Sequence, residues 1–318
     1  MSRPIVYVAL QQFCADDARP LRLLVEAGFD VRRSTLGRRL RREEMAEQLR
    51  DAHAVIAGIE PYDAAVLQQL PKLRCISRCG VGLDAIDLDE ARRRGIAVVR
   101  TAEEVIEPVA QMTVAMVLAL ARNLPQHAYD ARQGRWNKRT GVLLAEWTIG
   151  LVGFGRIGRR VEQLLRAFGP RIMMTDPNVV PPDVPASVAR RTLAELLAES
   201  DVVSLHADSR REAGPLIGAA ELALMKPGSF LVNTARGHLV DEPALVAALR
   251  SGHLAGAALD VFDPEPYTGA LATLPQALCT PHVSTLTRAS RVAMELRAAQ
   301  QVVDYFASQP AAAARVGR

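Results

Sequence analysis

The sequence predicts an α/β protein built from two doubly wound parallel sheets, and three observations support this prediction. Short, continuous apolar runs alternate with helical patterns that stop at glycine, which is typical of parallel βαβ units. A second series of the same kind begins near Thr148. The chain has 318 residues, which is enough for two domains at about 150 residues each.

The first series occupies the first hundred residues. Apolar, β-branched runs predict strands at residues 5–10, 54–57, 73–77 and 97–99. The patterns between them predict helices at residues 18–27, 62–70 and 88–94. Gly28 and Gly95 follow the first and last of these helices, where glycine adopts the left-handed conformation that ends a helix.

Residues 108–124 predict a long helix that is apolar nearly all the way round, with Pro108 in its first turn. Such a helix must be buried. Two arrangements are open: a core helix within the monomer, or a helix packed across a subunit interface. Polar residues dominate from 126 to 140, which predicts an exposed arm or linker.

The second series predicts strands at residues 148–152, 172–175, 202–205, 230–233 and 257–260. A helix after the first of these strands should end where Gly169 and Pro170 follow Phe168, and another helix is predicted at 243–250. Thr192 and Glu195 have the spacing of a capping box, which predicts a short helix there. The alanine-rich tail from residue 311 is expected to fray.

The formal charge of +4 does not by itself indicate a nucleic-acid partner. The densest basic stretch, residues 32–42, is followed at once by Glu43 and Glu44, and it lacks the interleaved aromatic side chains that stack on bases. We interpret it as a solvated loop and helix start. No apolar run approaches the ~20 residues that a membrane span needs. We therefore expect neither a nucleic-acid partner nor a membrane segment.

The cysteines and the N-terminus indicate the compartment. Cys14, Cys75, Cys79 and Cys279 show no paired CxxC spacing, so reduced thiols and no metal site are expected. The apolar run at residues 5–10 follows one arginine and has no small-residue cleavage site after it, so we interpret it as a strand rather than a signal peptide. A cytoplasmic protein is expected.

The second series opens with a dinucleotide-binding pattern. Gly153, Gly155 and Gly158 form a GxGxxG motif between a predicted strand and a predicted helix. The first glycine permits a tight turn, the second lets the backbone approach a pyrophosphate, and the third lets helix and strand pack closely. The backbone N–H groups of Arg156 and Ile157 would face the phosphate oxygens at the positive end of the helix. A glycine turn without a ligand is the alternative.

Asp176 indicates which nicotinamide cofactor binds. It lies at the end of the next predicted strand, 18 residues past Gly158. A carboxylate there accepts hydrogen bonds from a free ribose 2′-hydroxyl and repels a 2′-phosphate. Neither Pro177 nor Asn178 supplies a compensating cation, so the sequence favours NAD over NADP.

Five motifs in order extend the pattern well beyond a glycine loop. They are GLVGFGRIG (150–158), LIGAAELALMKPG (216–228), VNTARG (232–237), ALDVFDPEP (258–266) and TPH (280–282), preceded by CGVGLD (79–84). In these motifs the chain resembles the NAD-dependent D-2-hydroxyacid dehydrogenases, the family of phosphoglycerate dehydrogenase. The resemblance implies Rossmann-like and flavodoxin-like domains, and an oxidoreductase that acts on a D-2-hydroxy acid or its 2-oxo acid.

The resemblance also implies a catalytic set. Arg236 would bind the substrate carboxylate and polarise the C2 oxygen, a task that suits the planar, permanently charged guanidinium. His282 would be the general acid and base, because imidazole titrates near neutral pH. Glu265 would orient the His282 ring and stabilise the imidazolium.

Further positions are implied for the cofactor and the substrate. The resemblance places Thr234, Ala235 and Asp260 at the cofactor, with Asp260 near the nicotinamide. His206 matches a position that lines the cofactor cleft, although a histidine that ends a buried strand often has a structural role. The backbone amides of Gly80, Val81 and Gly82 would hold the substrate carboxylate, and a plain glycine turn is the alternative.

Two departures from the family pattern concern the substrate and the outer cofactor contacts. Ahead of the long apolar helix, many members carry an Asn and an Ala-Glu pair where this chain has Val105 and Ala110-Gln111. After His206 the family usually continues with a proline turn, whereas this chain has residues 208–210, Asp-Ser-Arg. The choice of 2-hydroxy acid is therefore left open.

The family's organisation implies that the second series is inserted into the first. Residues 1–99 and 287–318 would form a discontinuous substrate-binding domain, and residues 100–286 the NAD-binding Rossmann domain. A helix from Arg288 onward, with an apolar stripe, would return to the first domain. The family is usually dimeric through the long apolar helix and the arm after it, so we expect a homodimer through residues 108–124.

The resemblance leaves rival functions open. Phosphoglycerate dehydrogenase and hydroxypyruvate or glyoxylate reductase activities both fit the motifs. Transcriptional co-repressors that respond to NADH resemble the same family and can retain Arg236, Glu265 and His282. A formate dehydrogenase is not supported, because those enzymes carry glutamine at the position of Glu265.

Overall fold

The computed structural model describes residues 3–180, 183–208 and 213–309, so the tail from residue 311 lies outside the described residues. The chain forms two compact units. The first unit comprises Met1–Val105 and Leu286–Arg318, and the second comprises Ile106–Thr285. The family resemblance predicts that the chain passes from one domain to the other near Arg100 and again near Thr285. Each unit is described below by itself.

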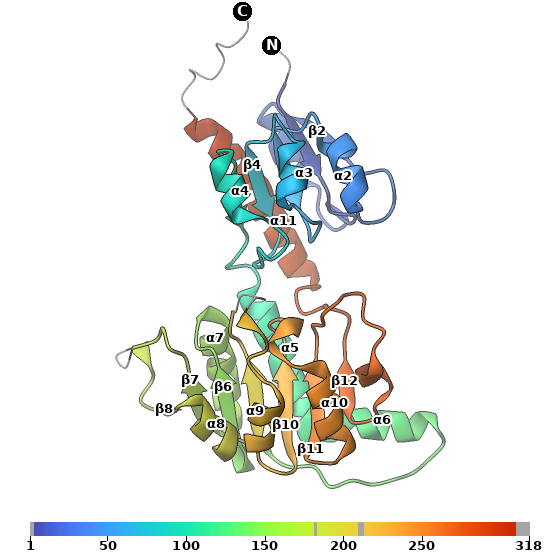
Figure 1. Cartoon of the computed structure of the whole chain (residues 1–318), viewed down its shortest axis with the longest axis vertical. Coiled ribbons are helices and arrows are strands. Elements are labelled where there is room, and N and C mark those ends of the chain that lie inside the picture. Colours follow the sequence, from blue (N-terminus) through green and yellow to red (C-terminus); the bar gives the residue numbers. More distant parts are fainter. Residues whose placement is uncertain (1–2, 181–182, 209–212, 310–318) are drawn as a thin grey trace, which may run out of the picture. The chain divides into compact units, whose positions relative to one another are not determined.

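The first unit contains a five-stranded parallel sheet in the order β2-β1-β3-β4-β5. This is the flavodoxin-like strand order. Its strands are β1 (Ile5–Val8), β2 (Asp30–Arg33), β3 (Ala54–Ala57), β4 (Cys75–Arg78) and β5 (Ala97–Arg100). Figure 1 labels two of these strands, β2 and β4. The sequence did not predict β2, because this edge strand carries three charged residues and shows no apolar run.

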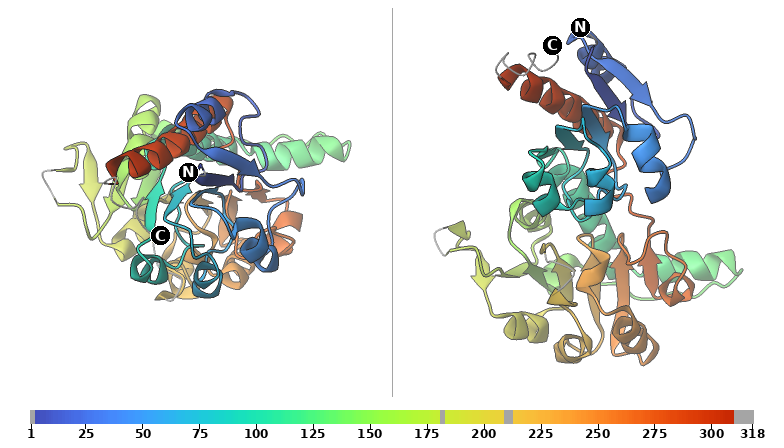
Figure 2. Two further views of the ribbon diagram at one scale, coloured as in Figure 1. Left: turned by 90° about the horizontal axis from the view of Figure 1, so that it is seen from above. Right: turned by 45° about the horizontal axis from the view of Figure 1, so that its top comes forward.

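Five helices complete the first unit: α1 (Arg19–Glu26), α2 (Arg42–Leu49), α3 (Ala64–Gln68), α4 (Leu88–Arg93) and α11 (Arg288–Ser308). The late helix α11 packs against α1 and β4. In both views of Figure 2 its red ribbon lies beside the blue segments from the start of the first unit. Glu295 of α11 accepts a hydrogen bond from the amide of Cys14 at 2.7 Å, and Ser77 of β4 donates to the carbonyl of Ala298 at 2.9 Å. The helix α11 is thus part of the same core as α1 and β4.

The second unit contains a seven-stranded parallel sheet in the order β12-β11-β10-β9-β6-β7-β8. From β8 to β11 this is the order of a dinucleotide-binding Rossmann sheet, whose switch point lies between β6 and β9. Its strands are β6 (Thr148–Val152), β7 (Arg171–Thr175), β8 (Val188–Arg190), β9 (Val202–Leu205), β10 (Ser229–Asn233), β11 (Leu254–Leu259) and β12 (Ala277–Cys279). Every strand predicted here is present, and β8 and β12 are short additions at the edges.

Helices of the second unit are α5 (Ile106–Ala121), α6 (Leu124–Arg132), α7 (Arg156–Leu165), α8 (Leu193–Glu199), α9 (Ala219–Leu224) and α10 (Glu242–Arg250). The predicted capping box is confirmed, because the Thr192 side chain accepts from the amide of Glu195 at the start of α8. The predicted exposed arm is helical in its first part: Asp130 is the one buried residue of α6, and residues 131–140 are exposed.

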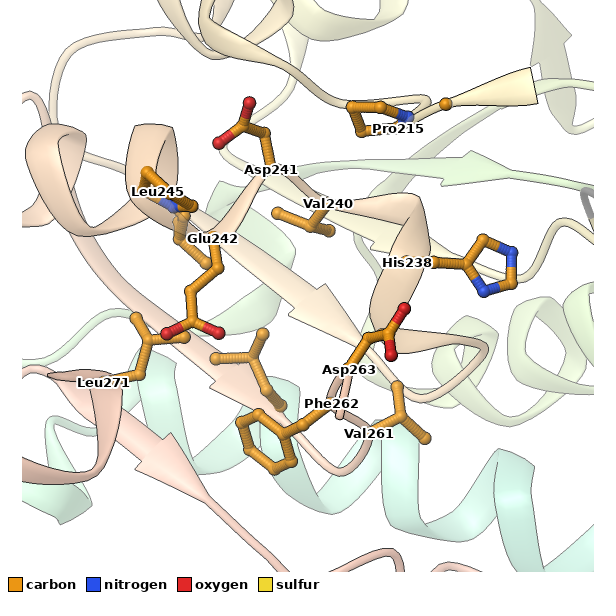
Figure 3. A pocket seen from close by; sticks show the side chains of 14 residues that line it. Pro215, His238, Val240, Asp241, Glu242, Leu245, Val261, Phe262, Asp263 and Leu271 are labelled. Atoms are coloured by element: carbon orange, nitrogen blue, oxygen red, sulfur yellow. The ribbon is translucent and has the colours of Figure 1, made fainter. Parts of the chain in front are cut away.

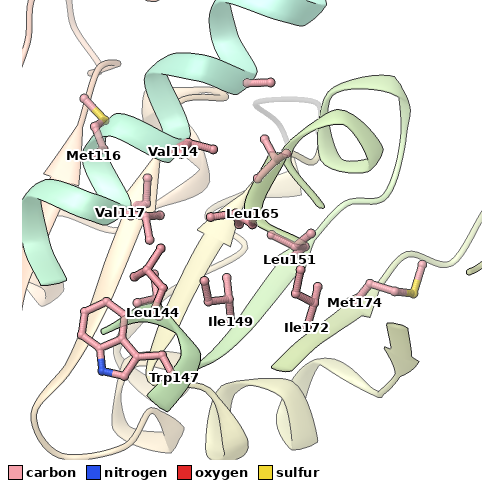
Figure 4. Close-up of a cluster of buried hydrophobic side chains, with 14 of the residues drawn as sticks. Val114, Met116, Val117, Leu144, Trp147, Ile149, Leu151, Leu165, Ile172 and Met174 are labelled. Atoms are coloured by element: carbon pink, nitrogen blue, oxygen red, sulfur yellow. The ribbon is translucent and has the colours of Figure 1, made fainter. Parts of the chain in front are cut away.

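The long apolar helix α5 packs on α7, β10 and β11 of its own unit. Figure 4 shows Val114 and Val117 of α5 directed into the same core as Ile149 and Leu151 of β6. These side chains are at most 9% exposed. One face of α5 is therefore a core face within the monomer, as one of the two predicted arrangements requires.

Within the described ranges, every helix falls short of the length and hydropathy that a bilayer span requires. The same part of the chain contains no group of three or more His, Cys, Asp or Glu side chains arranged to hold a metal ion. All four cysteines are free thiols.

Candidate active site

Two of the three motif glycines are required by packing within the protein. Gly153 follows β6 with φ +92°, and a Cβ there would lie 2.5 Å from the carbonyl carbon of His206 at the end of β9. A Cβ on Gly158 would lie 2.3 Å from the carbonyl oxygen of Gly153. Any side chain at either position would force the β6–α7 turn apart.

Gly155 is different, because a Cβ at this position would meet nothing within 4 Å. Its φ of −72° is one that any residue adopts. Gly155 precedes α7, and helix geometry gives the amides of Arg156 and Ile157 no acceptor within the helix. The open space above Gly155 and these N–H groups suit an anion at the positive end of the helix.

Replacing Gly155 with alanine is expected to leave the free energy of unfolding nearly unchanged and to weaken NADH binding at least tenfold, since a methyl group would fill the space of a pyrophosphate oxygen. Fluorescence titration with NADH and thermal unfolding measure the two effects. The matched control is Gly153→Ala, which should destabilise the protein. Unchanged NADH affinity in the Gly155 variant would contradict the assignment.

Asp176 lies directly after β7 and is fixed by two backbone amides. Its Oδ2 accepts from the amide of Phe154 inside the glycine loop, and its Oδ1 accepts from the amide of Asn178, both at 2.8 Å. A carboxylate has about four lone-pair sites, so both oxygens can accept further hydrogen bonds. The side chain is thus held beside the loop in an orientation that suits a ribose 2′-hydroxyl.

Replacing Asp176 with alanine is expected to reduce the preference for NADH over NADPH, because the charge that repels a 2′-phosphate is lost. The ratio of kcat/KM for the two cofactors is the measurement. Asn178→Ala serves as the control, since it keeps the carboxylate and should keep the preference. An unchanged ratio in the Asp176 variant would mean that another group selects the cofactor.

His206 directly follows β9 and packs against Gly153 and Gly158 of the glycine loop. Its amide donates to the carbonyl of Val152 at 2.7 Å, and its Nε2 lies 2.9 Å from Ser204 Oγ. Burial lowers the pKa of His206 to about 4, so the ring is neutral at neutral pH. These contacts favour the structural alternative for this side chain.

Arg236 follows β10 in a turn that Asn233 organises. The Asn233 amide nitrogen donates to the carbonyl of Arg236 at 2.8 Å, and its side-chain oxygen accepts from the amide of Ala235 at 3.0 Å. Gly237 then packs so tightly that a Cβ would lie 2.1 Å from the carbonyl carbon of Phe262. Arg236 is therefore presented at the carboxyl end of a central strand, where α/β sheets bind ligands.

Thr234 lies in the same turn and is almost fully buried. Its hydroxyl is 2.8 Å from the hydroxyl of Thr113 on α5, which also donates to the carbonyl of Val109. The role of Thr113 could not be predicted from the sequence, because it depends on a contact between distant segments. Asn233 lies in the VNTARG motif, and its bonds are local, to residues two and three positions ahead.

His282 and Glu265 are paired in the structure. His282 Nδ1 lies 2.9 Å from Glu265 Oε2 and 3.1 Å from Oε1, and the amide of Phe262 donates to Oε1 at 3.0 Å. Partial burial by itself raises the pKa of Glu265, but the hydrogen bond and charge of His282, the Phe262 amide and the charge of Arg236 together lower it. The carboxylate is therefore ionised at neutral pH. With Nδ1 engaged, Nε2 is the nitrogen that can exchange a proton with a ligand.

The turn that carries His282 is held by Asp260. His282 has φ +53°, which is uncommon for a residue other than glycine, so the turn needs support. Asp260 is fully buried and accepts from the amides of Val283 and Ser284 at 2.9 and 2.8 Å, and from the hydroxyls of Thr280 and Ser284. The sequence predicts Asp260 beside the nicotinamide, whereas its bonds in the structure support the His282 turn.

In the first unit, the predicted carboxylate loop follows β4. Gly80 has φ +139°, and a Cβ there would lie 2.5 Å from the Arg78 guanidinium. The Gly80 amide donates to Thr101 Oγ1 at 2.7 Å, and the carbonyl of Gly82 accepts from Arg78 Nε at 3.1 Å. Because the Gly80 amide is already engaged, the amides of Val81 and Gly82 remain as the candidates for a substrate carboxylate.

The departures from the family pattern occupy two kinds of environment. Val105 is buried. The exposed Gln111 donates to Glu107 at 2.7 Å, and Glu107 pairs with Arg160 of α7. Asp208 is exposed. Residues 209 and 210 lie outside the described residues.

The second unit thus combines a glycine loop at the switch point of its sheet with an arginine and a carboxylate–imidazole pair. This combination is typical of nicotinamide-dependent dehydrogenases. Residues 114–284 match the family model described as D-isomer specific 2-hydroxyacid dehydrogenase, NAD binding domain. The chain belongs to the D-isomer specific 2-hydroxyacid dehydrogenase family.

Known proteins agree with this assignment. A glyoxylate reductase of Aeropyrum pernix is 37% identical over 278 residues, which cover 83% of this chain and 82% of that protein. A D-3-phosphoglycerate dehydrogenase of Methanocaldococcus jannaschii is 36% identical over 270 residues, but this chain spans only about half of it (51%). The structure of a D-lactate dehydrogenase from Aquifex aeolicus, complexed with NAD and lactic acid, is similar with a TM-score of 0.83 at 27% identity, covering 95% of each chain. The predicted fold class, family and NAD cofactor are confirmed.

Proposed function

We propose that this protein transfers a hydride between NAD(H) and a small 2-oxo acid, giving the D-2-hydroxy acid, or the reverse. The observation that carries the proposal is the 2.9 Å contact between His282 Nδ1 and Glu265 Oε2. A histidine oriented by an ionised carboxylate, on the sheet edge that also presents Arg236, is suited to proton transfer at a carbonyl oxygen.

In the reducing direction, Arg236 binds the substrate carboxylate and polarises the C2 carbonyl through its planar donors. Bound NADH supplies the hydride to C2. His282 Nε2 donates its proton to the C2 oxygen, so that the oxygen becomes a hydroxyl and the imidazolium becomes neutral. Glu265 holds the ring through Nδ1 and stabilises the imidazolium before transfer. In oxidation His282 takes the proton back.

For the first unit we propose the role of substrate-binding domain, with the amides of Val81 and Gly82 as candidate donors to a carboxylate. The second unit is the NAD-binding domain, and its glycine loop with Asp176 is our site for the pyrophosphate and ribose.

The test is a panel of 2-oxo acids: glyoxylate, hydroxypyruvate, pyruvate and 3-phosphohydroxypyruvate, with loss of NADH absorbance as the measurement. Turnover with at least one member supports a dehydrogenase. NADH binding without turnover of any member would overturn the proposed enzymatic function. The protein would then be interpreted as one that binds NADH and responds to it without catalysis.

A homodimer is part of the proposal, with its contact on α6 and the arm after it, alongside the exposed face of α5. The large exposed apolar side chains include Leu124, Tyr129, Trp136 and Leu143, and Trp136 is 87% exposed. The Asp130 carboxylate stabilises this arm, because it accepts hydrogen bonds from Arg135 at 2.8 Å and from other side chains of the arm. An ordered segment with exposed apolar groups is typical of a protein interface.

Replacing Trp136 with alanine is expected to shift the protein from dimer to monomer in sedimentation velocity at micromolar concentration, because a large aromatic anchor is lost. The control is Phe168→Ala, a partly exposed aromatic outside the arm. A wild-type protein that sediments as a monomer would contradict the dimer.

The free thiols support a reducing compartment such as the cytoplasm.

A further inference from the structure

A cavity of about 400 Å³ lies within the second unit, between the 3-10 turn Gly237–Leu239, the start of α10 and the segment after β11. Its volume is in the range of small-molecule sites, which span about 300–1,000 Å³. None of Arg236, Glu265, His282 or the glycine loop lines it. The cavity is therefore separate from the site that the proposed function uses.

The lining combines an apolar floor with carboxylates. Val240, Leu245 and Leu271 are buried and supply apolar surface. Figure 3 shows Glu242 on the side of Leu271, and Asp263 on the opposite side with His238. Asp241 also lines the cavity. Among the described residues, no arginine or lysine lines it.

Two of these carboxylates are fixed in place. Asp241 caps α10 by accepting from the amide of Ala244 at 3.0 Å. Glu242, in the first turn of α10, accepts from the hydroxyl of Tyr267 at 2.5 Å. The positive end of α10 is thus already compensated by two acidic side chains. The cavity disfavours anions and suits a cation attached to an apolar body.

The walls of the cavity are continuous with the catalytic groups. Gly237 directly follows Arg236, and its Cα packs against the carbonyl of Phe262. The amide of Phe262 in turn donates to Glu265 Oε1 at 3.0 Å. A ligand that moves either wall therefore moves the segments that hold Arg236 and Glu265.

We propose that this cavity binds a small organic cation, an ammonium or amidinium on an apolar body, and that its occupancy changes turnover of the 2-oxo acid. The binding site goes beyond the proposed function. The effect on turnover rests on it, so binding and turnover are measured separately.

Binding is tested by calorimetry with three probes of similar shape: phenethylammonium, 2-phenylethanol and phenylacetate. The cation should bind at least tenfold more tightly than the other two. In the double variant Asp241→Asn/Glu242→Gln, the asparagine still caps α10 and the glutamine can still accept from Tyr267, while two charges are lost; the cation should bind about tenfold more weakly. The matched control Tyr267→Phe removes the hydrogen bond to Glu242 but keeps every charge, and should bind the cation within twofold of wild type.

Several results would overturn the site. They are no cation binding to the wild type at millimolar concentration, equal affinity for the three probes, and unchanged affinity in the double variant. If the double variant does not fold, Glu242→Gln alone is compared with Tyr267→Phe, and equal cation affinity in these two proteins overturns the site.

Saturating phenethylammonium should change kcat/KM for the best 2-oxo acid at least twofold in the wild type and not in the double variant. Binding without any change in kcat/KM would overturn the coupling and keep the site. If no 2-oxo acid is turned over, the proposed function fails, whereas the calorimetry still decides whether the cation binds.

Discussion

Replacing His282 with alanine is expected to lower kcat for 2-oxo acid reduction by about 10²–10⁴ while NADH binding stays unchanged. In the proposed mechanism the imidazole supplies the proton to the C2 oxygen, and the hydrogen bonds of its ring go to Glu265 rather than to the glycine loop. Steady-state kinetics and NADH fluorescence titration measure the two effects. Activity retained at the wild-type level would mean that another group donates the proton.

The matched variant is Glu265→Gln, which keeps the shape of the side chain and removes its charge. The glutamine no longer stabilises the imidazolium, so the rate of reduction should fall and its pH optimum should move to lower pH. A variant with reduced kcat and an unchanged pH profile would show that Glu265 acts only as a spacer.

Replacing Asp260 with alanine is expected to reduce the free energy of unfolding by about 3 kcal/mol, because buried donors to a charged acceptor lose their partner. The turn that carries His282 at φ +53° loses its support, so kcat should fall as well. Chemical denaturation and kinetics on the same preparation measure both effects.

The control for this variant is Ser284→Ala, which removes one donor and keeps the carboxylate with its remaining partners. It should cost about 1 kcal/mol and little activity. If the Asp260 variant is stable and its NADH affinity alone falls, Asp260 contacts the cofactor, as the family resemblance implies.

Much of the fold could be predicted because parallel sheets bury both faces of their central strands. The strands β6, β9 and β10 are continuous apolar runs for this reason, and the sequence predicts all three. The edge strand β2 could not be predicted, because one side of an edge strand has no neighbour and tolerates charged residues such as Arg32 and Arg33. The helix α6 was missed because its polar composition resembles that of a linker.

The site could be predicted wherever a short motif carries the chemistry. The glycine loop, Asp176 and Arg236 occupy the strand ends that the sequence indicates. The pairing of His282 with Glu265 is implied only by the family resemblance. The support that Asp260 gives to the His282 turn could not be predicted, because hydrogen bonds between distant turns leave no periodic signal in the sequence.

The packing of α11 on β4 has a consequence for the order in which the protein is made. Residues 106–285 form a contiguous unit, so that unit has all of its sequence before the ribosome reaches α11. The strands of the first unit are synthesised first, but α11 (residues 288–308), which packs on two of them, is synthesised last. During translation, the apolar surface that α11 later covers stays open to chaperones and to neighbouring nascent chains, whereas every residue that the second unit needs has been synthesised before α11.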